Sequence, residues 1–156
     1  MNVREFQLGD ERALHVVYHS AIHEVASKDY TTEQIEAWAP ESLGLEAIWT
    51  NKMREIRPFV VEDALGRIVA YADVQSNGYI DHFFVSGPHA RQGIGTLLMN
   101  RIHEVAHEKS IPVLTSHVSR TAQPFFRKFD FSVIEQRAPV VRGVVVPNAL
   151  MRKELV

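Results

Sequence analysis

The turn at residues 85–96 constrains the fold of this chain more than any other feature of the sequence. It reads VSGPHARQGIGT, and its three glycines and Pro88 separate a predicted strand at 79–85 from a predicted helix that reaches about Lys109. The first N–H groups of such a helix have no intrahelical partner, and glycine at 93 and 95 leaves room for an anion beside them. Because Arg91 adds a positive charge, we expect the turn to bind phosphate; the alternative is that its glycines serve backbone geometry alone.

Two well-known phosphate-binding motifs do not fit this turn. A Walker loop ends in Gly-Lys followed by Ser or Thr, which does not follow here. In a Rossmann fingerprint the third glycine would fall at Leu98, and the strands predicted before the turn form an antiparallel meander rather than a βαβ unit. The turn therefore indicates a different nucleotide-binding fold.

Hydrophobic periodicity and turn residues predict an α+β domain with a mostly antiparallel sheet. Besides the helix after the glycine-rich turn, helices are predicted over residues 11–25, after a Thr31/Gln34 capping box and before Pro40, at 45–53, and at 121–129 with Ser119 as the N-cap. The predicted strands lie at 3–7, 59–62, 68–75, 79–85, 112–118, 131–141 and 144–155, and the last two are joined at Arg142-Gly143.

Composition limits the classes of function that the chain can carry. Its 156 residues suit one domain, 1–156, and its lack of cysteine excludes a disulfide framework, a thiolate metal site and a cysteine nucleophile. A net charge of −2 argues against nucleic acid or a membrane surface as partner. We find no signal peptide and no membrane span, and so expect a cytoplasmic protein. The oligomeric state stays open, with a homodimer as one arrangement.

The glycine-rich turn, the order of elements and the later segment AQPFFRKFDF at 122–131 together resemble the GCN5-related N-acetyltransferase (GNAT) family over nearly the whole chain. The C-terminal residues 142–148 and 151–155 resemble a branch of uncharacterised bacterial acetyltransferases within it. The resemblance implies a mixed, mostly antiparallel sheet of about seven strands flanked by helices and splayed between the fourth and fifth strands. Acetyl-CoA would be the cosubstrate, wedged into that opening.

The resemblance also implies which residues hold acetyl-CoA. The pyrophosphate would lie on the N–H groups of residues 92–96, Ser119 would contact the pantetheine arm, and the N–H of Phe84 or Val85 would stabilise the thioester oxygen. Phe125 and Phe126 would pack along the arm, unless they belong to the core, as helical spacing commonly indicates. The implied cofactor-binding residues are Phe84, Val85, Arg91, Gln92, Gly93, Ile94, Gly95, Thr96, Ser119, Phe125 and Phe126.

The sequence departs from the family pattern at three positions. The Gln or Arg that opens the family's turn motif falls on Ala90, which leaves backbone N–H groups to do most of the binding. The family's tyrosine, which often protonates the departing thiolate, is Phe126, and the usual glycine after it is Asp130. The familiar general acid is therefore missing.

The reaction needs a base more than it needs an acid. An amine with a pKa near 10.4 must lose a proton before it attacks, whereas the CoA thiol, with a pKa of about 8.5, leaves readily. Family members place bases at the positions of Asp81 and Tyr79, and we rank Asp81 first, with Tyr79, His82 and then His117 behind it. Strand alternation predicts Tyr79 and Asp81 on one face and His82 on the other, unless a bulge intervenes. The competing interpretation of Asp81 is a solvated carboxylate at a strand end.

Two histidine patterns suggest metal sites that we do not expect to exist. His103-Glu104-Val105-Ala106-His107 matches the H-E-x-x-H motif of zinc proteases. Both histidines are predicted to point away from the apolar face of their helix, so a zinc ion there would sit in open solvent. His15, His19 and His23, spaced four residues apart, are likewise expected on the surface. We predict no metal.

The function that follows is direct, acetyl-CoA-dependent transfer of an acetyl group to a primary amine of a small molecule or peptide. Two alternatives remain: an acyl-CoA-binding sensor that has lost catalysis, suggested by Phe126, and the zinc hydrolase of the H-E-x-x-H match. The acceptor side, residues 31–49, contains Trp38, Glu41, Glu46 and Trp49. This mixture is compatible with a cationic amine and with many other acceptors.

Overall fold

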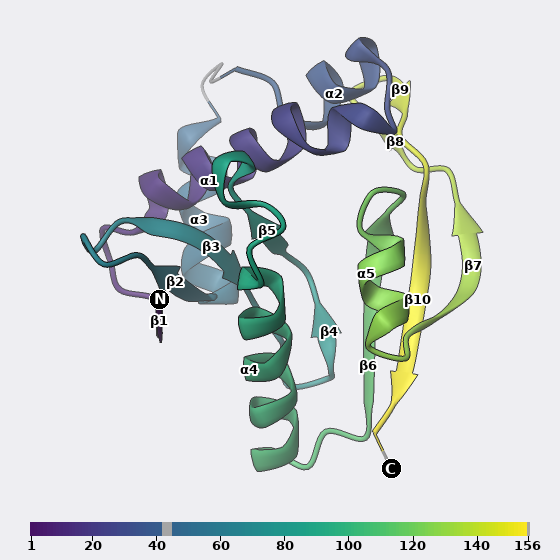
Figure 1. The fold of residues 1–156 in the computed structure, drawn as a ribbon. Coiled ribbons are helices and arrows are strands. Elements are labelled where there is room, and N and C mark those ends of the chain that lie inside the picture. The colour runs from purple at the N-terminus through teal and green to yellow at the C-terminus, as the bar shows by residue number, and fades with distance from the viewer. Residues whose placement is uncertain (42–44, 156) are drawn as a thin grey trace.

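The computed structural model describes residues 1–41 and 45–155 and arranges them in strands and helices that alternate along the chain (Figure 1). The helices are α1 (Glu11–Glu24), α2 (Thr32–Trp38), α3 (Glu46–Ile56), α4 (Ile94–Glu108) and α5 (Gln123–Lys128), with short 3₁₀ turns η1 (Ala26–Lys28) and η2 (Gly87–His89). The strands are β1 (Asn2–Arg4), β2 (Phe59–Glu62), β3 (Ile68–Ala72), β4 (Tyr79–Ile80), β5 (Phe83–Val85), β6 (Val113–Ser119), β7 (Ser132–Arg137), β8 (Val140–Val141), β9 (Val144–Val145) and β10 (Asn148–Glu154).

The strands form two four-stranded sheets that separate in the middle of the molecule. One has the order β1-β2-β3-β5 and the other β4-β6-β10-β7, and β4 lies parallel to β6 while the other pairs are antiparallel. Because β4 pairs with β6 and β5 pairs with β3, the chain leaves one sheet and joins the other between residues 80 and 83. The predicted α+β class and the opening between the fourth and fifth predicted strands are confirmed.

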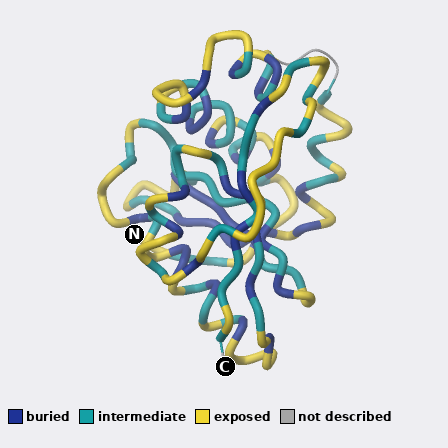
Figure 2. The backbone as a smooth tube through the Cα atoms, turned by 90° about the vertical axis from the view of Figure 1, so that its right-hand side faces the viewer, coloured by how far each residue is buried: buried dark blue, intermediate teal, exposed yellow. Residues whose placement is uncertain are grey.

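Helices cover the first sheet on both faces. Val60 and Tyr71 project from one face into a cluster with Leu14 of α1 and Met53 of α3. The opposite face packs against Leu98 and its neighbours on α4, in a second cluster that continues into β6, α5 and β10. Figure 2 shows buried residues in both the strands and the helices around them. No helix in the described ranges is long and apolar enough to cross a membrane.

Three long predicted strands are interrupted in the structure. The prediction of one strand at 79–85 is wrong, because β4 and β5 are separated at Asp81-His82. The strands predicted at 131–141 and 144–155 each divide in two, and β8 and β9 form a separate small hairpin with Arg142-Gly143 at its tip. Pro139 and Pro147 lie at these breaks, where the lack of an N–H prevents continued pairing.

Most other boundaries agree with the sequence. The Thr31/Gln34 capping box is confirmed, with Thr31 Oγ1 accepting the Gln34 N–H and Gln34 Oε1 accepting the Thr31 N–H. The helix predicted at 45–53 continues to Ile56. Ser119 Oγ accepts the Ala122 N–H at 3.2 Å, although α5 begins only at Gln123 and its N-cap is Ala122.

Asp130 adopts a backbone conformation that favours glycine. It follows the end of α5 with φ +68°, a left-handed conformation that costs an L-residue about 1 kcal/mol relative to glycine. Its carboxylate also faces the negative end of a helix dipole. We expect Asp130→Gly to raise the free energy of unfolding by about 0.5–1 kcal/mol, measured by urea denaturation. Asp130→Ala is the control: it removes the charge but keeps the strain, and an equal gain from it would assign the effect to the charge.

Candidate active site

The opening between β5 and β6 leads directly to the glycine-rich turn at the start of α4. Arg91 and Gly93 have positive φ angles of 62° and 80°, a pairing that turns successive N–H groups to the same side. In the described part of the chain, none of the N–H groups from Arg91 to Thr96 donates to an acceptor. This row of free donors at the positive end of a fifteen-residue helix is suited to a phosphate group.

Gly95 lies under an aromatic ring. A Cβ at this position would meet Cζ of Phe125 at 3.1 Å, so glycine is what lets α5 pack against the turn. Phe125 is half-buried, whereas Phe126 is 2% exposed and packs against Phe83 and Phe131 in the core. Phe126 therefore packs in the core, the second of the two alternatives stated for it, rather than at the surface of the opening. Ile94 is also buried, and Arg91, Gln92 and Gly93 are exposed.

The register of β5 decides which of its N–H groups faces the opening. Phe84 pairs with Tyr71 and Val85 with Ala70, and Ser86 N–H donates to Val69 at the end of the ladder. Since antiparallel N–H groups alternate in direction, that of Val85 turns away from β3 and toward β6. Ser119 lies at the far end of β6, on the other side of the opening.

A buried carboxylate holds the break between β4 and β5. Asp73 is 1% exposed, and its Oδ1 accepts the N–H groups of Asp81 at 3.0 Å and His82 at 2.6 Å. Its Oδ2 accepts from Nε2 of Gln75, and its own N–H donates to the His82 carbonyl. Asp73 thus substitutes for a strand partner, and this explains why the strand bulges at these residues.

Burial raises the pKa of Asp73 to about 6 from its ordinary value of 3.8. Because the folded state then holds this proton more tightly than the unfolded chain, stability falls as the pH rises from about 4 to about 6. Asp73→Asn should keep the bulge and remove this decrease, which amounts to about 3 kcal/mol. Urea midpoints of both proteins across that pH range measure the difference. Asp73→Ala leaves the N–H groups of Asp81 and His82 without an acceptor, so this variant should be destabilised at every pH. If Asp73→Ala were as stable as Asp73→Asn, the assignment would be contradicted.

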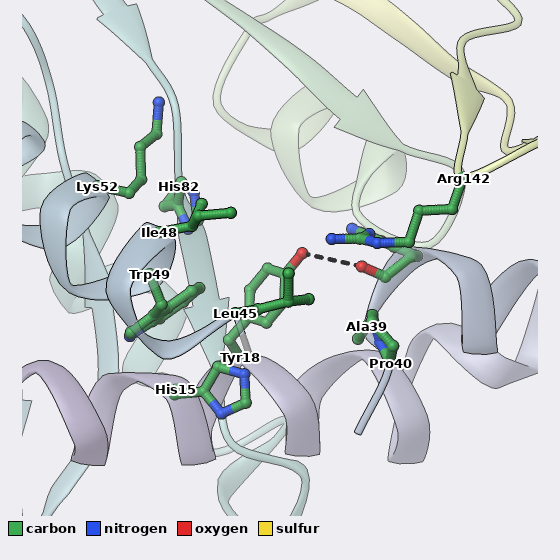
Figure 3. Close-up of a pocket in the computed structure, with 11 residues that line it drawn as sticks. His15, Tyr18, Ala39, Pro40, Leu45, Ile48, Trp49, Lys52, His82 and Arg142 are labelled. Carbon is green, nitrogen blue, oxygen red and sulfur yellow. Dashed lines mark hydrogen bonds between the residues drawn. The ribbon is translucent and has the colours of Figure 1, made fainter. Parts of the chain in front are cut away.

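Two adjoining cavities lie beside the bulge. The first, here the cleft cavity, has a volume of about 240 Å³ and is lined by Tyr79, Asp81, His82, Phe84, His117 and Ser119, among others. The alternation of faces was predicted unless a bulge intervened, and the strand does break here, so that Asp81 and His82 both line this cavity. The second, here the tryptophan cavity, has a volume of about 180 Å³ and contains Trp38, Trp49, Lys52 and Arg142 (Figure 3). Tyr18, Trp38 and His82 line both.

The candidate base Asp81 carries a partner that sequence reasoning missed. Its Oδ2 lies 2.5 Å from Nζ of Lys52 on α3, and this hydrogen bond raises the pKa of Lys52. Asp81 is therefore an ion-paired carboxylate on the cavity wall rather than a free carboxylate at a strand end. The three-residue spacing of Lys52 from Trp49 placed both on one helix face, but nothing local indicated which strand residue they would meet.

His82 is a neutral imidazole that lines both cavities. Burial lowers the pKa of His82 to about 4, and Nδ1 lies 2.9 Å from the hydroxyl of Tyr71. Burial also raises the pKa of Tyr71 well above 10, so the tyrosine keeps its proton. His82 therefore faces the cavities uncharged at neutral pH.

Tyr79 and His117 contact each other on the two paired strands β4 and β6. The Tyr79 hydroxyl lies 2.9 Å from Nδ1 of His117, one residue from β4 and the other from β6. Burial raises the pKa of Tyr79 and lowers that of His117, so both are uncharged at neutral pH. The fold thus brings all four candidates, Tyr79, Asp81, His82 and His117, to one cavity.

Of the other histidines named in the sequence analysis, His107 is exposed as predicted, whereas His15, His19, His23 and His103 are only partly exposed. His103 is half-buried rather than turned to solvent: its Nδ1 lies 2.7 Å from the Met99 carbonyl and its Nε2 lies 2.9 Å from Nζ of Lys153. The expectation that His15 lies on the surface is also wrong, since it lines the tryptophan cavity against Trp49. His19 and His23 are half-buried and stack on each other. Over residues 1–41 and 45–155, no three His, Asp or Glu side chains are grouped as a metal site.

Comparisons with known proteins agree with this geometry. A family model described as the acetyltransferase (GNAT) domain matches residues 26–155. The uncharacterised N-acetyltransferase YafP of Escherichia coli K12 is 28% identical over 152 residues, which cover 97% of this chain and 95% of YafP. A GCN5-related N-acetyltransferase from Rhodopseudomonas palustris has a similar structure, with a TM-score of 0.91, 22% identity, and coverage of 99% and 95%. YncA of Salmonella typhimurium, solved with its cofactor acetyl-CoA, has a TM-score of 0.70, 17% identity, and coverage of 100% and 94%.

Proposed function

Because this chain belongs to the GNAT acetyltransferase family, we propose that it is an acetyl-CoA-dependent N-acetyltransferase, formed by one domain over residues 1–156, that transfers the acetyl group directly to a primary amine. The observation that carries this proposal is the row of free N–H groups from Arg91 to Thr96 beside the opening between β5 and β6. Those donors would hold the pyrophosphate, and the opening would take the pantetheine arm between the sheets.

The arm would run past a largely apolar wall. Phe125 lies against Gly95 at the mouth of the opening, and Phe83 continues the wall along β5. Ser119, at the end of β6 just before α5, would contact the arm from that side. The Val85 N–H, which faces the opening, would donate to the thioester oxygen as negative charge develops on it. With the cosubstrate bound in this way, the thioester carbon would lie next to the cleft cavity.

Proton removal is assigned to Asp81. An acceptor that enters as an ammonium ion would meet this carboxylate on the cavity wall and displace Lys52 from it. The carboxylate would take one proton from the ammonium ion, the free amine nitrogen would attack the thioester carbon, CoA would leave as the thiolate, and the nitrogen would release its second proton to water or to the thiolate. Neutral His82 and the Tyr79–His117 pair line the same cavity and are the next candidates for the proton. Phe126 supplies no proton, so the thiolate would depart uncatalysed or take a proton from water.

The experiment is an assay of thiol release from acetyl-CoA with a panel of primary amines. The chain contains no cysteine, so the protein adds no background to a thiol reagent. Amine-dependent thiol release, with one acetylated amine formed per thiol, is the expected result. Binding of acetyl-CoA with no turnover for any amine would favour the alternative, an acyl-CoA-binding sensor, for which the missing tyrosine at Phe126 is the supporting observation.

A further inference from the structure

The charges around the two cavities are not balanced. Asp81 is the one carboxylate among the described residues that line either cavity, and it is already paired with Lys52. Glu41, a candidate for binding a cationic acceptor, instead lies 3.0 Å from Nε2 of His19 and lines neither cavity. Arg142 lines the tryptophan cavity, and its charge meets no carboxylate in the described ranges. Among the described residues, Arg142 is therefore a positive charge in the tryptophan cavity with no carboxylate partner.

Arg142 is held in a fixed place. It occupies the tip of the β8–β9 hairpin with φ +46°, and its Nη1 donates to the Ala37 carbonyl at 2.8 Å. One of its five N–H donors is used in this way, and the others remain available. Figure 3 shows the guanidinium reaching into the cavity opposite Ile48 and Trp49 of α3. A planar guanidinium with a free edge is suited to a planar carboxylate.

Tyr18 and Trp38 line both cavities, the one that contains Asp81 and the one that contains Arg142. The Tyr18 hydroxyl donates to the Trp38 carbonyl at 3.3 Å, and burial raises the pKa of Tyr18 to about 12. Trp49 lines the tryptophan cavity as well. The acceptor side therefore combines one carboxylate, one guanidinium and two indole rings in adjoining cavities.

We propose that the acceptor is an amino acid or a similar amine that also carries a carboxylate and a bulky apolar group, with its carboxylate bound by Arg142, its apolar group between Trp38 and Trp49, and its amine at Asp81. This inference rests on the proposed function for the identity of the amine as the reacting group. Binding of the carboxylate does not depend on turnover and is tested separately.

The test uses the tryptophans themselves. The chain has two, Trp38 and Trp49, and both line the tryptophan cavity, so intrinsic fluorescence reports its occupancy. The ligands are phenylalanine, phenylalaninamide, 2-phenylethylamine and 3-phenylpropionate, titrated with and without CoA. The two carboxylates should bind about 10- to 100-fold more tightly than the amide and the amine, because a charge-assisted hydrogen bond is lost in the latter. Equal affinities across the four ligands would overturn the proposal.

Two variants test whether Arg142 causes the preference for carboxylates. Arg142→Met keeps the length of the side chain and removes the charge, and it should abolish the preference for carboxylates while leaving acetyl-CoA affinity unchanged. Arg67→Met is the matched control, since Arg67 pairs with Asp63 at the exposed β2–β3 turn and lines neither cavity. If Arg142→Met still binds the two carboxylates more tightly than the amide and the amine, another residue binds the carboxylate and the inference is refuted. A protein that binds the carboxylates but releases no thiol would refute the proposed function and leave this inference standing.

Discussion

Replacing Asp81 with asparagine is expected to lower kcat/KM by about 10²- to 10⁴-fold, the range typical of a lost general base. The amide has nearly the same shape as the carboxylate but cannot take a proton from the ammonium ion. Acetyl-CoA affinity should stay nearly unchanged, because Asp81 lies on the acceptor side of the opening. Steady-state kinetics with a saturating acceptor and a separate binding titration of acetyl-CoA measure the two effects independently.

Lys52→Met is the matched control for this experiment. It breaks the same ion pair but leaves the carboxylate, so its loss of activity should be much smaller than that of Asp81→Asn. Full activity in Asp81→Asn would refute the assignment and direct attention to Tyr79, His82 and His117. The rate of the unmodified enzyme should rise with pH to a plateau without an alkaline decline from a titrating acid at position 126. Phe126→Tyr should increase the rate only if departure of the thiolate limits turnover.

A bulky side chain at Gly95 is expected to abolish acetyl-CoA binding. In the unmodified protein, acetyl-CoA at 100 times its Kd should stabilise the native state by about 2.7 kcal/mol and raise Tm accordingly. Gly95→Val fills the space beside the free N–H groups and pushes against Phe125, whose ring already lies 3.1 Å from the position of a Cβ. The Tm shift on adding acetyl-CoA should therefore disappear.

The contact with Phe125 calls for a second variant. Gly95→Val should lower Tm by displacing this ring whether or not acetyl-CoA is present, so Phe125→Ala is added to it to relieve the collision. The double variant should regain thermal stability without regaining the acetyl-CoA shift. A shift of normal size in Gly95→Val would remove the glycine-rich turn from the site.

The parts of this site that are local in sequence could be predicted. The glycine-rich turn and its helix depend on residues close together in the chain, and both are found where the sequence predicts them. The opening between the sheets was implied by the resemblance to the family. The bulge at Asp81-His82 could not be predicted, because its hydrogen-bond acceptor is the side chain of Asp73 on another strand. Sequence alternation describes a regular strand, and a carboxylate that replaces a backbone partner leaves no periodic signal.

The charges of the acceptor side were missed for the same reason. Lys52 is an ordinary polar residue on a helix until α3 is placed against the bulge. Arg142 could be predicted as a turn residue, but the hairpin that carries it over the tryptophan cavity exists because Pro139 and Pro147 end the longer strands. Glu41 and Glu46 looked like candidate acceptor ligands because they are near in sequence to Trp38 and Trp49, yet neither lines the cavities.

The two prolines that flank the β8–β9 hairpin also mark off, along the chain, a segment on the acceptor side of the site from the segments on the cosubstrate side. Residues 139–147 leave the second sheet and return to it, with Val146 buried in a cluster with α2 and Tyr30 donating a hydrogen bond to the Pro147 carbonyl. The cosubstrate side of the opening lies on other segments of the chain. Under the proposed function, acceptor choice could therefore be altered by exchanging residues 139–147, because none of the predicted acetyl-CoA-binding residues lies in this segment.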